Sequence, residues 1–268
     1  MDIGTAKPTV QERLRAPHHL IDVADPDDTW SLAIFQREAN KAIQKIQENH
    51  HLPFLVGGTG QFIRAIIEGW KIPSGKPDYR LREVLTQWSK DLGTYALHSK
   101  LSILDPVAAS SIDPSNVRRT IRALEVIFAT GRLFSDQKES GYRLYNPLLI
   151  GFTRPRGELY QRIDTRITKM IECGLVNEVQ SLLDRGYSPD LPTMSAIGYR
   201  EIVSYLHGKI TLEDAVILMK RRTREFVRRQ VNWFKPNDPN IHWYQADGNT
   251  LELVENLIAN WIASKQNI

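Results

Sequence analysis

Short apolar runs bounded by polar or turn-forming residues predict four β-strands, which cover residues 19–24, 53–56, 147–152 and 241–245. The second and third runs are almost continuously apolar, which is typical of strands covered on both faces. Between the first two, apolar residues from Ile34 to Ile46 recur at helical spacing after Ser31, a side chain suited to an N-cap. A strand, a helix and a strand in this order indicate a βαβ unit, and therefore an α/β fold with a parallel sheet.

Between residues 72 and 145 no strand pattern occurs, and helices are expected over residues 79–92, 94–104, 106–111 and 114–130. Asp105-Pro106 and Asp113-Pro114 each place an acidic N-cap before a proline of the first turn, which is a helix-start pattern. Gly131 follows the last of these helices and is typical of a helix end.

This helical stretch indicates two domains. We expect an all-helical insertion domain over residues 76–145, after a linker-like break at 74–77, within an α/β core formed by residues 1–75 and 146–268. After the third strand the chain is expected to be mostly helical, with periodic stretches over residues 157–183, 199–206, 212–234 and 251–264.

The composition of the 268 residues, with 41% hydrophobic and 25% charged side chains, is that of an ordinary globular enzyme. Cys173 is the single cysteine, so no internal disulfide can form and a reducing compartment is expected. No apolar run approaches the ~20 residues of a membrane span, and the first residues are not a basic-then-apolar signal. We expect a cytoplasmic protein without a membrane segment.

A glycine block, Val-Gly-Gly-Thr-Gly at residues 56–60, ends the second apolar run. Glycines let backbone amides approach an anion closely, and Thr59 would aim its hydroxyl at it. A P-loop requires Gly-x-x-x-x-Gly-Lys-Ser/Thr, and within residues 1–268 no Gly-Lys pair precedes serine or threonine. Two interpretations stay open, an ordinary tight turn and part of a substrate site.

Arg118, Arg119 and Arg122 lie in the first turns of the predicted 114–130 helix, where the helix macrodipole is positive. Each arginine there opposes helix formation by roughly 0.3–1 kcal/mol. We therefore expect an anion outside the helix to bind them, against the alternative of a solvated cationic face. Because the net charge is only +4, the clustering of these arginines indicates an anion-binding surface better than the net charge of the whole chain does.

Later helices carry further cations whose role the residues alone leave open. Lys220, Arg224 and Arg228 share one face of the most basic helix, which is either solvated or a surface for phosphate groups. Arg166 and the arginine one turn before it flank Asp164, so ion pairing within that helix is the alternative to an anion site.

The segment 193–200 places a serine and a glycine ahead of a new helix, and helix N-termini bind anions readily. The seven histidines show no metal-ligand spacing, because His18-His19 and His50-His51 are adjacent pairs whose side chains do not converge on one ion. No structural metal is expected.

Several blocks occur in order along the whole chain. They are Met-Asp-Ile-Gly-Thr-Ala-Lys-Pro at 1–8, His-His-Leu-Ile-Asp-Val at 18–23, the glycine block at 56–60, Arg118-Arg119 with Arg122-Ala-Leu-Glu-Val126, Ala196-Ile-Gly-Tyr-Arg200, and Thr223-Arg224 followed by Arg229-Gln230 and Trp233-Phe234. In combination they resemble the tRNA dimethylallyltransferases, also called tRNA isopentenyltransferases.

The resemblance implies a P-loop-NTPase-like parallel sheet core with a helical insertion domain and a helical C-terminal part. It implies transfer of a dimethylallyl group from dimethylallyl pyrophosphate to the exocyclic N6 amine of the adenosine at tRNA position 37, next to the anticodon. Such chemistry needs a base for the amine proton and neutralisation of the leaving pyrophosphate by amides, arginines and a Mg²⁺ ion. The expected partners of this chain, acting as a monomer, are a prenyl pyrophosphate and the anticodon stem-loop of tRNA.

The resemblance also assigns residues. It places Thr59 in the reaction channel beside the flipped adenosine, and it makes Arg166 and Arg224 candidates for pyrophosphate binding. The residues that it assigns to the tRNA side are Arg80, Arg118, Arg119, Thr120, Ile121, Arg122, Ser195, Ala196, Ile197, Gly198, Tyr199 and Arg200.

In the family, the block at 1–8 is internal and follows a strand, a P-loop, a helix and a strand ending in the proposed general-base aspartate. The resemblance therefore implies that residues 1–268 alone lack that segment and transfer no prenyl group. A start assigned at an internal methionine and a real truncation would both give this sequence. Loss of a central strand would leave an unpaired edge in the sheet.

Two other functions remain as alternatives. One is a catalytically inactive tRNA-binding remnant. The other is a prenyltransferase that acts on free adenine nucleotides, against which the three arginines at 118, 119 and 122 argue, because a mononucleotide gives them nothing to hold.

Overall fold

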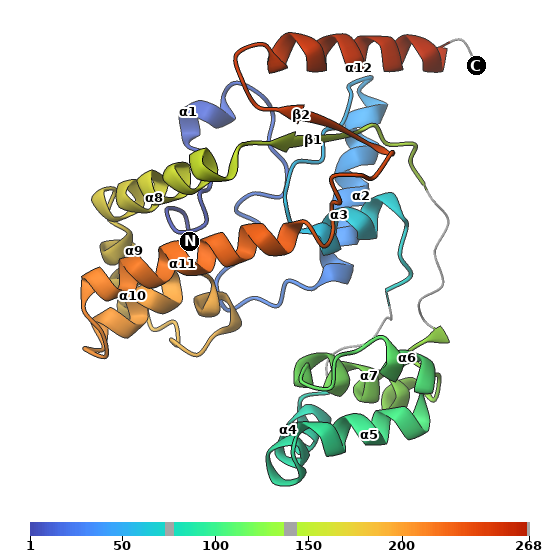
Figure 1. Cartoon of the computed structure of the whole chain (residues 1–268), viewed down its shortest axis with the longest axis vertical. Helices are drawn as coiled ribbons and strands as arrows, with labels where there is room; N and C mark the ends of the chain where they lie inside the picture. Colours follow the sequence, from blue (N-terminus) through green and yellow to red (C-terminus); the bar gives the residue numbers. More distant parts are fainter. Residues whose placement is uncertain (73–77, 137–143, 267–268) are drawn as a thin grey trace. The chain divides into compact units, whose positions relative to one another are not determined.

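A computed structural model describes residues 1–72, 78–136 and 144–266 (Figure 1), and the predicted linker at 74–77 lies outside this part. The chain forms two compact units. Unit 1 consists of Met1–Trp30, Ala42–Gln61 and Asn146–Ile268, and unit 2 consists of Ser31–Lys41 and Phe62–Tyr145. Residues of α2 (Leu32–Glu48) and α3 (Gly60–Ile67) belong to both units.

Unit 1 contains a parallel pair of strands, β1 (Leu149–Thr153) and β2 (Ile241–Gln245). Their register runs from Leu149 opposite Ile241 to Thr153 opposite Gln245. Gly151 lies opposite Trp243, and a Cβ atom at Gly151 would come within 2.4 Å of the indole ring. The glycine is therefore needed for the large aromatic side chain to lie across the neighbouring strand.

The helices of unit 1 surround a core of aliphatic side chains with Met194, Tyr199 and Met219. α11 packs against α8 and α10, and α10 also packs against α9. The helices are α1 (Val10–Arg13), α8 (Arg156–Glu172), α9 (Leu175–Asp184), the short 3₁₀ helix η2 (Pro192–Ser195), α10 (Tyr199–Leu206), α11 (Leu212–Gln230) and α12 (Thr250–Gln266).

Two helical predictions in unit 1 were too long. The stretch expected at 157–183 is two helices, because Gly174 has φ +96°, a conformation that interrupts a right-handed helix. The stretch expected at 212–234 ends at Gln230, and the residues after it form a turn. That turn lets Trp233 leave the helix face, which matters for the site described below.

Unit 2 contains a bundle of α4 (Tyr79–Leu92), α5 (Thr94–Leu104), α6 (Pro106–Ser110) and α7 (Val117–Thr130). α4 and α5 have the predicted bounds. Asp105 caps α6 as predicted, accepting a hydrogen bond from Ala108 N at 2.9 Å. The predicted start of α7 at Asp113-Pro114 is wrong, since Asn116 is the N-cap and Asp113 instead accepts from Ser115 N at 2.8 Å.

Two of the four predicted strands do not form. Residues 19–24 and 53–56 have no strand conformation, so the predicted βαβ unit between them is absent from the described structure. A strand needs a neighbouring segment to accept its backbone hydrogen bonds, and the described residues supply none here. Phe54 and Val56 are 66% and 89% exposed as a result. The α/β class rests instead on β1 and β2.

Ser31 caps α2 as predicted, because its Oγ accepts a hydrogen bond from Ile34 N at 3.2 Å. Within unit 2, Phe35 meets Phe62 edge-on with ring centroids 4.8 Å apart. Among the helices of the described ranges, none combines the length and apolar character of a membrane-crossing segment.

Candidate functional site

The glycine loop at residues 57–60 lies against the C-terminal end of α11. Gln230 donates a hydrogen bond from Nε2 to the carbonyl oxygen of Gly58 at 3.2 Å. A Cβ atom on Gly58 would lie 2.3 Å from Gln230 Nε2, and one on Gly60 would lie 2.3 Å from Trp233 Cγ. Both glycines are therefore needed for this close approach. Thr59 between them is exposed, and its hydroxyl has no partner among the described residues.

Arg224 lies on the same helix, six residues or about 9 Å of helix before Gln230. Its Nη2 donates to the two carboxylate oxygens of Asp164 at 2.7 and 2.6 Å. Its guanidinium stands 5.1 Å from the ring centre of Tyr160, a cation–π distance. Asp164 therefore pairs with α11, and the alternative of ion pairing with the arginines of its own helix is wrong for this carboxylate.

The two candidates for pyrophosphate binding differ in their surroundings. In the described structure, the Nε atom of Arg224 is buried without a hydrogen-bond partner. An unsatisfied buried donor costs about 1–3 kcal/mol. A ligand oxygen that accepted a hydrogen bond from this Nε would remove that cost, which favours binding of the ligand. Arg166 is exposed and has no ion-pair partner in the described part of the chain.

The block at residues 1–8 forms a turn held by charges. Lys7 pairs with both Asp2 and Asp22, and Arg13 Nη1 lies 2.7 Å from Asp22. The hydrogen bonds to Asp2 and Asp22 raise the pKa of Lys7, and the hydrogen bonds from Lys7 and Arg13 lower the pKa of Asp22. Lys7 and Asp22 are therefore both charged at neutral pH.

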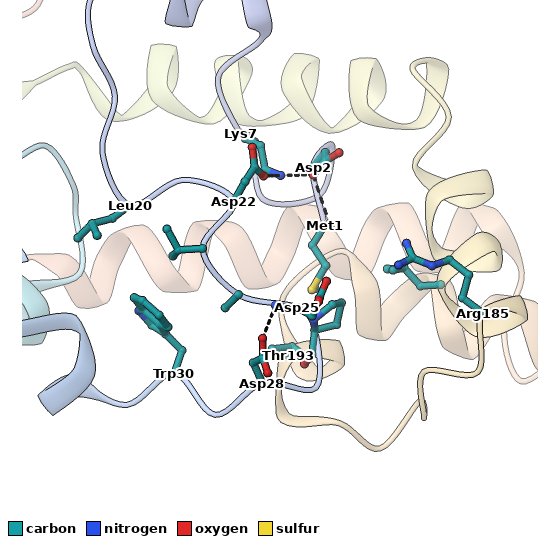
Figure 2. A pocket seen from close by; sticks show the side chains of 14 residues that line it. Met1, Asp2, Lys7, Leu20, Asp22, Asp25, Asp28, Trp30, Arg185 and Thr193 are labelled. Atoms are coloured by element: carbon teal, nitrogen blue, oxygen red, sulfur yellow. Dashed lines mark hydrogen bonds and ion pairs between the residues drawn. The ribbon is translucent and has the colours of Figure 1, made fainter. Parts of the chain in front are cut away.

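A cavity of about 690 Å³ opens beside this turn (Figure 2). Asp2, Lys7 and Asp22 line one part of it, and Trp30 and Thr193 line another. Thr193 donates from Oγ1 to the carbonyl oxygen of Pro26 at 2.6 Å, which ties the start of η2 to the N-terminal segment. The cavity is polar, and all of its lining residues belong to unit 1.

The segment 195–200 divides into exposed and buried residues. Ser195 is exposed and donates from Oγ to Pro192 O at 2.5 Å. Ala196 and Arg200 are also exposed, Ile197 is half-buried, and Gly198 is buried.

Tyr199 is fully buried, and its role in the structure is to hold the N-terminal turn. A Cβ atom on Gly4 would lie 2.4 Å from the Tyr199 ring, so the ring lies directly on the backbone of that turn. The Tyr199 hydroxyl donates to Glu178. Glu178 also accepts from the backbone amides of Asp2 at 3.0 Å and Ile3 at 2.7 Å. Burial, and then the Glu178 carboxylate, raise the pKa of Tyr199 far above its ordinary value.

Glu178 was not among the predicted site residues. The signal for it is weak, a carboxylate next to the apolar stripe of α9 formed by Leu175, Val179 and Leu182. Glu178 is half-buried. Its hydrogen-bond partners include the amides of the first residues of the chain, which sequence spacing does not reveal.

The other predicted tRNA-side residues lie in unit 2, where solvent exposure separates them. Arg80, Arg118 and Arg119 are exposed, whereas Thr120 and Ile121 are buried in the bundle. The predicted residues of unit 2 are Arg80, Arg118, Arg119, Thr120, Ile121 and Arg122.

Arg122 is tied to a buried carboxylate. Its Nη1 donates to Glu125 at 2.8 Å, and Arg82 of α4 donates to the same carboxylate from Nε and Nη2 at 2.9 Å each. The backbone amide of Asp78 is a further donor at 3.0 Å. Burial alone would raise the pKa of Glu125, but the hydrogen bonds from Arg82 and Arg122 outweigh it and lower the pKa below its usual value.

Replacing Arg118 and Arg119 together by alanine should weaken RNA binding without unfolding unit 2, because both side chains are exposed. We expect the log–log slope of affinity against salt to fall by about one unit for each phosphate that the variant no longer binds. Fluorescence anisotropy with an anticodon stem-loop RNA measures this, and Arg132→Ala at the other end of α7 is the matched control. If the slope equals that of the control, the two arginines form a solvated face only.

The comparisons with known proteins give the class of this chain. The family model described as IPP transferase matches residues 1–237. The tRNA dimethylallyltransferase of Roseiflexus sp. (strain RS-1) is 46% identical over 263 residues, which cover 98% of this chain and 86% of that protein. The chain therefore belongs to the IPP transferase family, a family of prenyl-transferring enzymes.

Solved structures agree with this assignment. The full-length tRNA isopentenylpyrophosphate transferase of Bacillus halodurans is similar with a TM-score of 0.71 and 41% identity, covering 100% of this chain and 85% of that one. A eukaryotic dimethylallyltransferase studied while acting on tRNA gives a TM-score of 0.80 and 25% identity, covering 98% of this chain and 69% of that one. The predicted α/β fold class is thereby confirmed.

Proposed function

We propose that this chain takes part in the transfer of a dimethylallyl group from dimethylallyl pyrophosphate to the N6 amine of the adenosine at tRNA position 37. The observation that carries the proposal is the 46% identity with a tRNA dimethylallyltransferase along 98% of the chain. In the reaction, N6 forms a bond to C1 of the prenyl group, the bond from C1 to the pyrophosphate oxygen breaks, and a base takes the proton from N6.

The described geometry supports different roles for the predicted site residues of unit 1. Thr59 offers an exposed hydroxyl, suited to hold the reacting adenosine, on a loop whose glycines pack against Gln230 and Trp233. Arg224 and Arg166 offer charge to the pyrophosphate. Asp164 fixes the orientation of Arg224 through two short hydrogen bonds, and such fixed donors stabilise a developing charge better than mobile ones.

RNA recognition is proposed for both units. In unit 2 it involves Arg80, Arg118 and Arg119, whose side chains reach solvent. In unit 1 it involves the exposed residues of the 195–200 segment. The target base must leave its stack to reach Thr59, so the arginines would bind the backbone around it.

Magnesium enters this proposal as an ion carried by the substrate. The described residues include no group of three or more His, Cys, Asp or Glu side chains that could hold a metal. Mg²⁺ in phosphate-transferring sites keeps several waters and binds substrate phosphates with one or two carboxylates. When bound to the pyrophosphate, it would neutralise charge on the leaving group. We also propose that the chain acts as a cytoplasmic monomer.

The test is prenylation of an anticodon stem-loop RNA with dimethylallyl pyrophosphate and Mg²⁺, followed by mass spectrometry of the nucleosides. Two proteins are compared, residues 1–268 and a version with a P-loop segment joined ahead of Met1. We expect prenylated adenosine at position 37 from at least one of them. The proposal fails if neither protein modifies the RNA, or if adenosine monophosphate is modified instead.

A further inference from the structure

Unit 1 contains a buried glutamate, Glu201, that is paired with two arginines in the same way as Glu125 of unit 2. Glu201 of α10 accepts a hydrogen bond from the Gly198 amide at 2.7 Å and from Arg200 Nε at 3.3 Å, and it is also paired with Arg222 of α11. Its carboxylate is fully buried, whereas the side chains of Arg200 and Arg222 are 46% and 28% exposed. We name this group the Glu201 cluster.

The Glu125 cluster, formed by Glu125, Arg82 and Arg122, has the same distribution of charge. The Glu125 side chain is 2% exposed, and the two arginines are 37% and 35% exposed. In each cluster one buried negative charge faces two positive charges that reach the surface. The surface that an approaching anion meets is therefore positive, and the carboxylate is out of its reach.

The clusters also fix the direction of the guanidinium groups. An arginine presents five N–H donors in a planar fork, and Arg222 uses only Nη1 on Glu201. The remaining donors are available while the side chain is held in place. A held side chain loses less conformational entropy when it binds a phosphate than a mobile one does.

We propose that the Glu125 and Glu201 clusters each present a fixed pair of guanidinium groups to phosphates of the RNA backbone. This adds Arg82 and Arg222 to the RNA-contacting residues, and it makes the two glutamates positioning residues. The inference rests on the proposed function, because it requires that the chain binds RNA. The proposal gives one physical reason why a glutamate lies beside the arginines in both the Glu125 cluster and the Glu201 cluster.

The first test replaces Arg82 and Arg222 singly by glutamine. The matched controls are Arg37→Gln in unit 2 and Arg221→Gln on α11, since both arginines are paired with partly exposed glutamates of their own helices, Glu38 and Glu225. Anticodon stem-loop binding is measured by anisotropy between about 50 and about 200 mM salt. Each test variant should lower the log–log slope by about one unit and the affinity at ~0.1 M salt on the order of tenfold.

The second test asks whether replacing Glu201 strengthens or weakens RNA binding. Glu201→Gln removes a negative charge, so arginines acting only as loose charges would bind RNA more tightly. If the cluster positions them, binding becomes several-fold weaker. Glu225→Gln, which removes a partly exposed carboxylate from α11, should leave affinity unchanged or raise it. Circular dichroism at the assay temperature checks the fold, and where Glu201→Gln unfolds the chain, the Arg222→Gln result decides.

The outcomes separate the two proposals. If the unaltered chain shows no salt-dependent binding of the stem-loop, the proposed function fails. If the unaltered chain binds, but Arg82→Gln and Arg222→Gln behave like Arg37→Gln and Arg221→Gln, the clusters are structural and this inference is overturned.

Discussion

Thr59→Ala is expected to slow prenyl transfer on the order of 10- to 1000-fold, the range for removing one well-placed hydrogen bond near a developing charge. RNA affinity should stay nearly unchanged, because it comes from many phosphate contacts elsewhere. The exposed hydroxyl has no partner among the described residues, while the glycines beside it are fixed against Gln230 and Trp233. The substitution should therefore remove an interaction with the substrate and not one within the protein.

The measurement is the single-turnover rate in the version with a P-loop segment joined ahead of Met1, together with the melting temperature. Thr165→Ala on α8 is the matched control, since this threonine is exposed in the same unit. If Thr59 instead caps α3, the variant would lose ~1 kcal/mol of stability and keep its rate. A lower melting temperature with an unchanged rate would therefore contradict the assignment of Thr59 to the reaction channel.

Glu125→Ala is expected to destabilise unit 2 by about 3 kcal/mol, because two arginines would be left without their shared buried partner. We place the effect at the low end of the range for buried ion pairs, since both arginines are partly solvated. It corresponds to a fall in melting temperature on the order of 10 °C. Glu83→Ala on α4 is the matched control, because Glu83 is exposed, and a change within ~0.5 kcal/mol is expected there.

Acid should remove the same contribution. The pKa of Glu125 is lowered in the folded protein from its ordinary 4.5, because its hydrogen bonds with Arg82 and Arg122 outweigh the effect of burial. A carboxylate whose pKa is lower in the folded than in the unfolded chain stabilises the fold when the pH is above the unfolded-state pKa. This stabilisation is lost as the pH falls through the folded-state pKa. The difference in melting temperature between the unaltered chain and Glu125→Gln should therefore shrink as the pH falls below the ordinary glutamate pKa of 4.5. A constant difference over this range would contradict the role of the ionised carboxylate.

The helices of unit 2 were predictable because their signals are local. Asp78 caps α4 through Leu81 N at 3.0 Å, and Gly131 ends α7 in the left-handed region at φ +66°. The prediction failed at the start of α7, where two candidate caps compete within four residues. Asp113 bonds to Ser115, and Asn116 takes the N-cap.

Strands were less predictable, because an apolar run becomes a strand only when another segment pairs with it. The runs at 147–152 and 241–245 pair with each other across about 90 residues and form β1 and β2. The runs at 19–24 and 53–56 are also rich in apolar residues but have no strand partner in the described structure.

The sequence by itself determined the helical bundle, the arginine-rich motifs and the resemblance to tRNA dimethylallyltransferases, because these depend on residues close together in the chain or on their order. Only the tertiary structure decided what individual motif residues do. In the tertiary structure, Tyr199 is buried against Gly4, and Asp164 forms its ion pair with Arg224 of another helix. The physical reason is that an ion pair between helices depends on the directions of side chains from distant segments, and sequence spacing does not contain those directions.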